Sequence, residues 1–241
     1  MPTLICLHYW AGAGREFDLL RPLLPPAMPL LAPDLPGFGA QAAPAGFDYS
    51  VAAYADWVAA FVAQQGVGNY LLGGHSMGGK IALALAARRP PGLRGLLLLA
   101  PSPPTPEPIA DAARAAALAA FGQPAEAAKT FATITNRPLP PAWRQAVIDD
   151  NLRTARPAWD AWLQAGSRED IAALMPHLNV PCRLLAGDHD RAIRLETQQT
   201  QTLPHLPTDT ELTVVPGAGH LLPLEAPAEV AQAVRQLILN N

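Results

Sequence analysis

Apolar residues along this chain occur in short continuous runs, and stretches with helical spacing separate most of these runs. The apolar runs cover residues 4–8, 29–33, 69–72, 95–100, 180–186 and 211–215. Strands that alternate with helices form a parallel sheet covered on both faces, and such strands are continuously apolar because neither face meets water. The pattern therefore predicts an α/β fold with a mainly parallel sheet of about six strands.

Helical patterns connect most of these predicted strands. They cover residues 15–24, 50–65, 80–88, 195–202 and 228–239. Ser50 opens the second of them and is a suitable N-cap, because its hydroxyl accepts a hydrogen bond from a free amide of the first turn. Two prolines after residue 24 end the first helix, since proline has no N–H group to continue it.

The middle of the chain interrupts this alternation. Helical stretches separated by prolines replace the strands there, and they cover residues 109–121, 125–134, 142–155 and 158–174. A helical block inserted between two strands of a parallel sheet lies close to the loops that carry an active site. We therefore expect residues 1–101 and 179–241 to form one core, and residues 102–178 to form a helical cap, or lid, within the same domain.

Residues 71–79 read Leu-Leu-Gly-Gly-His-Ser-Met-Gly-Gly and join a predicted strand to a predicted helix. A turn this short strains the backbone of the serine, and the glycines at positions 74 and 78 remove Cβ atoms that would otherwise collide. Such a turn holds the Ser76 hydroxyl clear of the sheet and directs the N–H of Met77 towards the reacting carbon. The stretch predicts a nucleophilic serine, with a plain glycine-rich turn as the alternative.

A serine hydroxyl needs a base to remove its proton, and the chain contains six histidines. His220 follows the last predicted strand in a Pro-Gly-Ala-Gly-His loop, at the strand edge where Ser76 is expected. His8 ends the first strand, where we expect a structural hydrogen bond, and the side chain of His75 is expected to point away from Ser76. Three others are predicted to be solvated loop residues: His177, His189 and His205. His220 is therefore the candidate base.

The imidazole of a catalytic histidine needs an acceptor on its far nitrogen, and this acceptor is usually a carboxylate. Gly-Asp-His-Asp at 187–190 follows the fifth predicted strand. Asp190 lies deep enough in this loop to turn back towards His220. Asp188 stays open as its rival and has an alternative use in capping the turn. The resulting order Ser, Asp, His is one of three that common serine triads show.

The second oxyanion donor is expected in the loop after the first strand, which faces the serine turn. The backbone N–H of Trp10 is the candidate, with that of Tyr9 as the alternative. The Gly-Ala-Gly sequence at 12–14 suggests the start of a dinucleotide-binding loop, but residue 17 is Phe rather than a third glycine. We therefore expect no nucleotide cofactor at this loop.

Taken together, these motifs resemble those of the α/β-hydrolases, and the resemblance extends over nearly the whole chain. Besides the serine turn and the loops of the candidate base and acid, it includes Asp-Leu-Pro-Gly-Phe-Gly at 34–39 and Glu-Ala-Pro at 225–227. The resemblance implies a three-layer α/β-hydrolase fold with a helical cap insertion. Family members usually begin with an antiparallel hairpin, whereas this sequence starts at the histidine-led strand, so we expect a sheet that lacks the hairpin.

The resemblance also implies a role for each candidate residue. Ser76 would be the nucleophile, His220 the base and Asp190 the acid of a triad. The N–H groups of Trp10 and Met77 would form the oxyanion hole. The loop after the first strand usually reads His-Gly in the family, and a tyrosine replaces that glycine here.

A triad of this kind activates attack on a carbonyl carbon, so the favoured reaction is hydrolysis of a small to medium apolar carboxylic ester through an acyl-enzyme. Lactonase, thioesterase, carbon–carbon bond hydrolase and perhydrolase activities use the same residues and stay open. We expect large side chains, several of them from the cap, to line the substrate pocket: Tyr9, Phe131, Trp143, Trp159, Trp162 and Leu221. Packing within the cap is the alternative for its aromatic residues.

Two rivals belong to other functional classes. The first is a ligand receptor that keeps the triad but holds its ligand instead of turning it over. The second is a lyase or cofactor-free oxygenase on the same scaffold, for which Lys80, one helical turn beyond Ser76, is a candidate residue. An ordinary helix lysine is the alternative interpretation of Lys80.

Composition and charge exclude several partners. Half of the 241 residues are hydrophobic, 15% are charged and the net charge is −3, without a basic cluster that would attract nucleic acid. No apolar run approaches the ~20 residues of a membrane span, and the start does not resemble a signal peptide. Cys6 and Cys182 lie in predicted strands and indicate neither a disulfide nor a metal site. We expect a cytoplasmic monomer or homodimer without cofactor or metal.

Overall fold

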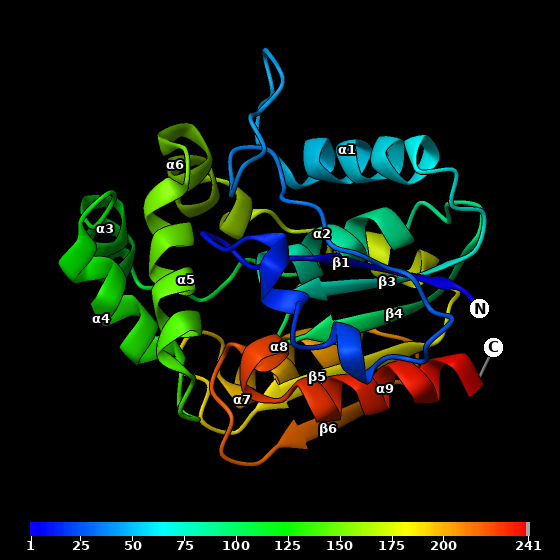
Figure 1. The fold of residues 1–241 in the computed structure, drawn as a ribbon. Coiled ribbons are helices and arrows are strands. Elements are labelled where there is room, and N and C mark those ends of the chain that lie inside the picture. Colours follow the sequence, from blue (N-terminus) through cyan, green and yellow to red (C-terminus); the bar gives the residue numbers. More distant parts are fainter. Residues whose placement is uncertain (240–241) are drawn as a thin grey trace.

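The computed structural model describes residues 1–239 and contains a six-stranded parallel sheet (Figure 1). The strands are β1 (Thr3–Leu7), β2 (Leu30–Leu31), β3 (Tyr70–His75), β4 (Leu93–Leu99), β5 (Cys182–Gly187) and β6 (Glu211–Val215). Their order in the sheet is β2-β1-β3-β4-β5-β6, and each neighbouring pair is parallel. The predicted α/β fold with about six strands is confirmed.

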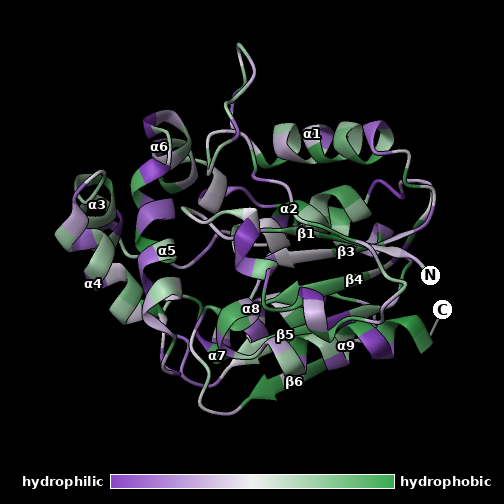
Figure 2. Ribbon diagram, in the orientation of Figure 1, coloured by the Kyte–Doolittle hydropathy of each residue, from purple (hydrophilic) through white to green (hydrophobic). Residues whose placement is uncertain are grey.

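Helices cover both faces of the sheet and make the fold three-layered. One face packs against α1 (Val51–Gln64) and α2 (Met77–Ala86), and the other packs against α9 (Pro227–Leu239). Neighbouring side chains of β1 separate accordingly, because Ile5 joins the first apolar cluster and Leu4 joins the second. In Figure 2, β4 and α2 are largely hydrophobic, as expected for elements buried at the centre of the molecule.

The helices of the core begin close to their predicted positions, with two exceptions. The Ser50 hydroxyl caps α1 by accepting a hydrogen bond from the N–H of Ala53 at 3.0 Å.

The helix predicted over residues 15–24 is wrong, because two 3₁₀ turns, Gly14–Phe17 and Arg21–Leu23, occupy that segment. Pro22 removes an N–H from it, and the following amides bond to carbonyls three residues back rather than four. The helix predicted over residues 195–202 is a short α7 (Leu195–Thr197) followed by a π-helical turn (Gln198–Thr202).

A helical insertion separates β4 from β5. It comprises α3 (Asp111–Ala119), α4 (Pro124–Ile134), α5 (Pro141–Arg153) and α6 (Arg156–Gln164). Figure 1 shows these helices beyond the carboxyl ends of the strands. The helix predicted over residues 158–174 is wrong in its second half, where 3₁₀ turns at Gly166–Arg168 and Ala172–His177 replace it. Gly166 and Pro176 both disfavour a continuous α-helix there.

The helical insertion packs onto the loops that follow the strands. Ile134 of α4 and Val147 of α5 share an apolar cluster with Tyr9 and Leu221. Trp159 of α6 packs in a second cluster with residues of the loop after β1. Within residues 1–239, no helix is both long and apolar enough to cross a membrane.

Candidate active site

The order of the strands opens a crevice at one edge of the sheet. β1 and β3 are neighbours, and the chain runs from β1 to β2 on one side and from β3 to β4 on the other, so the connections after β1 and after β3 leave in opposite directions. In parallel α/β sheets, ligands bind outside the carboxyl ends of the strands at such a reversal. Tyr9 and Trp10 follow β1, and Ser76 follows β3. The topology therefore brings the predicted nucleophile and the predicted oxyanion loop to the same crevice.

Ser76 occupies a strained turn between β3 and α2. Its backbone angles are φ 53° and ψ −116°, a conformation that non-glycine residues rarely adopt and that costs roughly 1–3 kcal/mol. A Cβ on Gly74 would lie 2.3 Å from the carbonyl oxygen of Gly78, and a Cβ on Gly78 would lie 2.3 Å from that of Leu7. Both glycines are therefore required for this turn, which is the tight strand-to-helix junction expected from the sequence.

Asp190, rather than Asp188, reaches the His220 side chain. The His220 Nδ1 atom donates to Asp190 Oδ2 at 2.7 Å, and both side chains are buried. The other carboxylate oxygen of Asp190 accepts from the amides of Ala192 and Ile193 at 2.8 and 2.9 Å. Asp188 instead accepts from the Gly217 amide, as a turn-capping residue does.

The protonation of His220 reflects two opposing effects. Burial is the largest single effect and disfavours the charged imidazole, but the charge of Asp190, its hydrogen bond and the charges of Glu107 and Glu16 together raise the pKa of His220 above its usual value of 6.5. The bond to Asp190 also holds the proton on Nδ1, which leaves Nε2 as the atom able to accept a proton. The hydrogen bonds of residues 1–239 do not include one between Ser76 Oγ and the His220 ring, although both groups line one pocket.

Glu225 holds the loop that carries His220. Glu225 lies in the short α8 (Leu222–Glu225), and its carboxylate accepts from the amides of Gly219 and Leu221, on either side of His220, at 2.9 and 3.1 Å. It also accepts from two amides of the helical insertion, those of Asn136 and Arg137. The sequence showed Glu225 only as part of the Glu-Ala-Pro motif, without this role.

His75 lies behind the site and contacts both Glu16 and the His220 loop. Its Nδ1 is 3.1 Å from Glu16 Oε1, and its Nε2 donates to the His220 carbonyl oxygen at 2.8 Å. Burial is the largest effect on both partners, and it lowers the pKa of His75 and raises that of Glu16. Sequence reasoning placed His75 away from Ser76 but missed Glu16, which lies 59 residues earlier in the chain.

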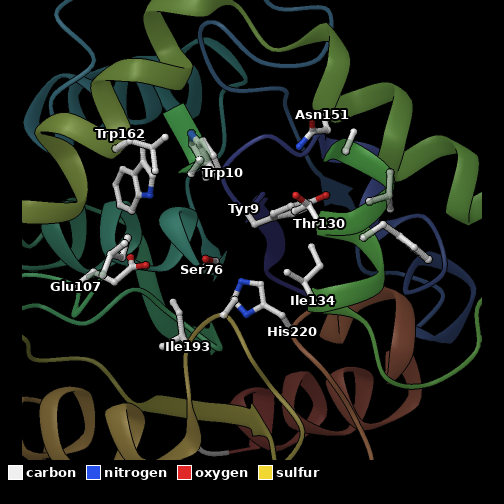
Figure 3. A pocket seen from close by; sticks show the side chains of 17 residues that line it. Tyr9, Trp10, Ser76, Glu107, Thr130, Ile134, Asn151, Trp162, Ile193 and His220 are labelled. Carbon is white, nitrogen blue, oxygen red and sulfur yellow. The ribbon is translucent and has the colours of Figure 1, made fainter. Parts of the chain in front are cut away.

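A cavity of about 210 Å³ opens above Ser76 and His220 (Figure 3). Its lining is mainly apolar, and three of the predicted pocket residues contribute to it: Tyr9, Phe131 and Trp162. Trp10, Glu107, Ile134 and Ile193 also line it. An apolar concave site with a few polar groups is the usual form of a small-molecule pocket.

Three other predicted pocket residues lie outside this lining. Trp159 packs against Trp10 with ring centroids 4.2 Å apart and the rings tilted by 48°, and its Nε1–H donates to the Ala117 carbonyl. Leu221 is fully buried in the cluster that joins the helical insertion to the His220 loop, and Trp143 packs against the same cluster. These side chains pack the insertion onto the core instead of facing the cavity.

Of the two candidate oxyanion donors, Trp10 lines this cavity, and Met77 directly follows Ser76, which also lines it. Met77 is the first residue of α2, and Trp10 lies in a tight turn where the Gly12 amide donates to the Tyr9 carbonyl. Neither the Met77 nor the Trp10 amide donates to another group in the turns and loops of residues 1–239. The Tyr9 ring, which replaces the usual glycine, is buried between the His75 ring at 5.3 Å and the His220 ring at 6.5 Å.

His8 and Lys80 have structural contacts away from the cavity. His8 donates from Nδ1 to the Tyr9 carbonyl and accepts the Leu35 amide at Nε2, so it links two loops. The Lys80 ammonium donates to the carbonyl oxygens of Thr105 and Glu169, and burial lowers its pKa to about 8. Lys80 is thus a buried residue that joins the two ends of the helical insertion, and it does not line the pocket.

Glu107 is a pocket residue that sequence reasoning missed. Its Oε2 atom is buried without a hydrogen-bond partner in residues 1–239, and burial raises the pKa of its carboxyl. A lone glutamate after a proline-rich stretch carries no signal for such a position. In the described part of the chain, His, Cys, Asp and Glu residues do not form a group of three that could hold a metal ion.

The chain is similar to characterised proteins over most of its length. It is 31% identical to 2-succinyl-6-hydroxy-2,4-cyclohexadiene-1-carboxylate synthase of Serratia proteamaculans, covering 99% of this chain and 94% of that protein. It is 33% identical to pimeloyl-[acyl-carrier protein] methyl ester esterase of Neisseria meningitidis, and the match covers 76% of this chain and 73% of that protein. Its fold matches that of a thermophilic esterase of Thermogutta terrifontis with a TM-score of 0.83 and 25% sequence identity. This match covers 100% of this chain and 90% of that protein.

Nearly the complete chain matches the sequence pattern of one protein family. Residues 4–233 match the pattern of the alpha/beta hydrolase family. The parallel sheet, the strained serine turn and the loops that meet above it agree with that match. The chain therefore belongs to the alpha/beta hydrolase family.

Proposed function

We propose that the protein hydrolyses carboxylic esters through an acyl-enzyme formed on Ser76. The observation that carries this proposal is the cavity shared by a serine in a strained strand-to-helix turn and by a histidine whose Nδ1 is bonded to a buried aspartate at 2.7 Å. This arrangement supports Ser76 as nucleophile, His220 as base and Asp190 as the acid that orients the base in acyl transfer.

In the proposed reaction, His220 Nε2 takes the proton of Ser76 as Oγ bonds to the ester carbonyl carbon. The N–H groups of Met77 and Trp10 stabilise the negative oxygen of the tetrahedral intermediate. The intermediate then expels the alcohol, which receives the proton from His220. Water attacks the acyl group in the same way, and the products are a carboxylic acid, an alcohol and free Ser76.

The lining of the cavity supports a small to medium apolar substrate. Its volume of about 210 Å³ and its walls of Tyr9, Phe131 and Trp162 suit an alkyl or aryl group. The position of the helical insertion, beyond the carboxyl ends of the strands, supports its assignment as a lid over the site. Two of the similar proteins described above are named esterases, which favours ester hydrolysis over lactone, thioester or carbon–carbon bond cleavage on the same residues.

The test is hydrolysis of p-nitrophenyl esters of increasing acyl length by the wild-type protein and by Ser76→Ala. We expect steady multiple turnover that falls by about 10³-fold or more in Ser76→Ala, because the covalent route is lost. Ser102→Ala is the matched control, since Ser102 is a nearby buried serine that does not line the cavity.

Three outcomes would contradict the esterase assignment. Activity that survives in Ser76→Ala would exclude an acyl-enzyme on this residue. A single turnover that leaves a lasting adduct on Ser76 would favour the ligand receptor. Absence of turnover across the whole ester series would favour a lyase on the same scaffold.

A further inference from the structure

A second cavity of about 600 Å³ adjoins the candidate active-site pocket. Four residues line both cavities: Glu107, Ile109, Ala192 and Ile193. Arg191 and Arg194 line the second cavity but not the first. We call this second cavity the arginine groove. It begins directly after Asp190, the candidate acid of the triad, so groove and pocket are parts of one surface.

The two arginines of the groove differ from the other basic residues of the protein. The chain has 17 lysines and arginines, all within the described residues. Fifteen of them have a hydrogen-bond, ion-pair or aromatic partner. Within residues 1–239, only the guanidinium groups of Arg191 and Arg194 have none. Both residues line the same cavity, and Arg191 directly follows Asp190 in the chain.

The carboxylates around the groove do not neutralise this pair. Glu107 and Glu196 line the groove, yet neither forms an ion pair with Arg191 or Arg194 in the described structure. Burial raises the pKa of Glu107, which favours its neutral form. Asp190, adjacent in the chain, is already bonded to His220. The lining of the groove therefore contains two arginines and one exposed glutamate, Glu196, and this balance of charge favours an anion.

We propose that Arg191 and Arg194 bind an anionic group of the substrate while the scissile ester lies at Ser76. This inference rests on the proposed function and specifies its substrate class: an ester whose acyl chain carries a terminal carboxylate or phosphate beyond an apolar spacer. Planar guanidinium groups bind both anions through paired hydrogen bonds. The spacer would occupy the first cavity, whose lining contains no lysine or arginine.

The test compares p-nitrophenyl monoesters of linear dicarboxylic acids of increasing length with analogues whose far carboxylate is a neutral carboxamide. At the spacer length that spans the two cavities, we expect kcat/KM to be about tenfold higher for the carboxylate, since two exposed charge contacts each contribute a modest amount. Added salt should reduce this preference. A parallel series ending in a phosphate monoester shows which of the two anions the groove prefers.

The variants locate the effect. Arg191→Gln combined with Arg194→Gln should abolish the preference for the anion and leave kcat/KM for the carboxamide within about twofold. Arg235→Gln is the control, because Arg235 is an exposed arginine of α9 that does not line either cavity. The inference is wrong if neutral and anionic esters react equally at every length, or if the preference persists in the double variant.

A failure of the proposed function gives a different result. In that case neither series is hydrolysed, and calorimetric binding of hexyl phosphate and of adipate to the wild-type protein tests the groove directly. Binding that weakens about tenfold in the double variant and is unchanged in Arg235→Gln supports the groove as an anion site. Binding that is absent, or equal in all three proteins, overturns it.

Discussion

His75 donates a hydrogen bond from Nε2 to the backbone carbonyl of His220 at 2.8 Å, so one buried histidine supports the loop of another. A carbonyl oxygen only accepts, and the proton of a neutral His75 must therefore be on Nε2. Its Nδ1 is then an acceptor that faces the carboxyl group of Glu16 at 3.1 Å. A protonated Glu16 completes this chain of hydrogen bonds, in agreement with the raised pKa of that carboxyl.

Glu16→Gln and Glu16→Ala should therefore differ. The glutamine amide donates to His75 Nδ1 as a carboxylic acid does, so we expect Glu16→Gln to change kcat only slightly at neutral pH. Glu16→Ala leaves Nδ1 unpaired, which should cost about 1–3 kcal/mol of unfolding free energy and lower kcat more than it changes KM. Urea denaturation and steady-state kinetics measure both effects.

The pH dependence of stability gives an independent check on Glu16. A carboxyl whose pKa is raised in the folded state favours the folded protein less as pH rises above its unfolded value of about 4.5. The wild-type protein should therefore lose stability relative to Glu16→Gln as pH increases from that value. A difference that stays constant over this range would mean that folding does not raise the pKa of Glu16.

The pH profile of ester hydrolysis should reflect the raised pKa of His220. The protonated imidazole cannot accept the Ser76 proton, so kcat/KM should decrease as pH falls, with a midpoint above 6.5. Stability should change with pH in the opposite direction to activity. The stabilising contribution of the charged His220–Asp190 pair is complete below pH 6.5 and is lost as pH rises through the raised pKa of His220. A midpoint at or below 6.5 would contradict the influence of Asp190.

Asp190→Asn and Asp188→Asn form a matched pair within one loop. Asp190→Asn presents an NH₂ group to His220 Nδ1 and favours the wrong tautomer, so we expect kcat/KM to fall by about 10²–10⁴-fold. Asp188→Asn changes a residue that caps a turn, and its activity should stay within a few-fold of the wild type. Comparable losses in both variants would remove the basis for assigning Asp190 as the acid.

Glu225→Gln should disturb the His220 loop although Glu225 does not line the cavity. Its carboxylate accepts hydrogen bonds from four backbone amides. The side-chain NH₂ group of a glutamine is itself a donor and cannot accept a hydrogen bond from these N–H groups. We expect a loss of about 1–3 kcal/mol in unfolding free energy and a lower kcat. Glu229→Gln, at a half-exposed ion pair with Arg137, is the control and should leave kcat unchanged. An unaltered kcat in Glu225→Gln would show that the loop keeps its position without this anchor.

Trp162→Leu should change substrate preference, whereas Trp143→Leu should not. Trp162 lines the cavity, so a smaller side chain enlarges it and should favour longer acyl groups in the p-nitrophenyl ester series. Trp143 packs against the cluster that joins the helical insertion to the His220 loop. Its replacement should lower the unfolding free energy and leave the substrate preference unchanged. Each substitution should cost less than the ~3–5 kcal/mol typical of truncating a buried tryptophan to alanine.

Much of the fold was predictable because its signals are local. Apolar runs mark the strands, and their alternation with helices decides the parallel sheet. Two of the three segments that differ, residues 15–24 and 158–174, contain a proline or a glycine that tightens or interrupts the helical turn, whereas residues 195–202 contain neither. Apolar spacing indicates which side of a segment is buried, but it does not separate an α-helix from successive 3₁₀ turns.

The sequence by itself determined the sheet, the serine turn and the order of the candidate triad residues, since each depends on neighbours along the chain. Only the tertiary structure decided that Asp190 meets His220 and that Trp162 faces the cavity while Trp159 packs against Trp10. It also decided the contacts of His75, whose partners lie 59 and 145 residues away. Hydrophobic spacing shows that a side chain is buried, but the partners of a buried polar group depend on how distant segments fold together.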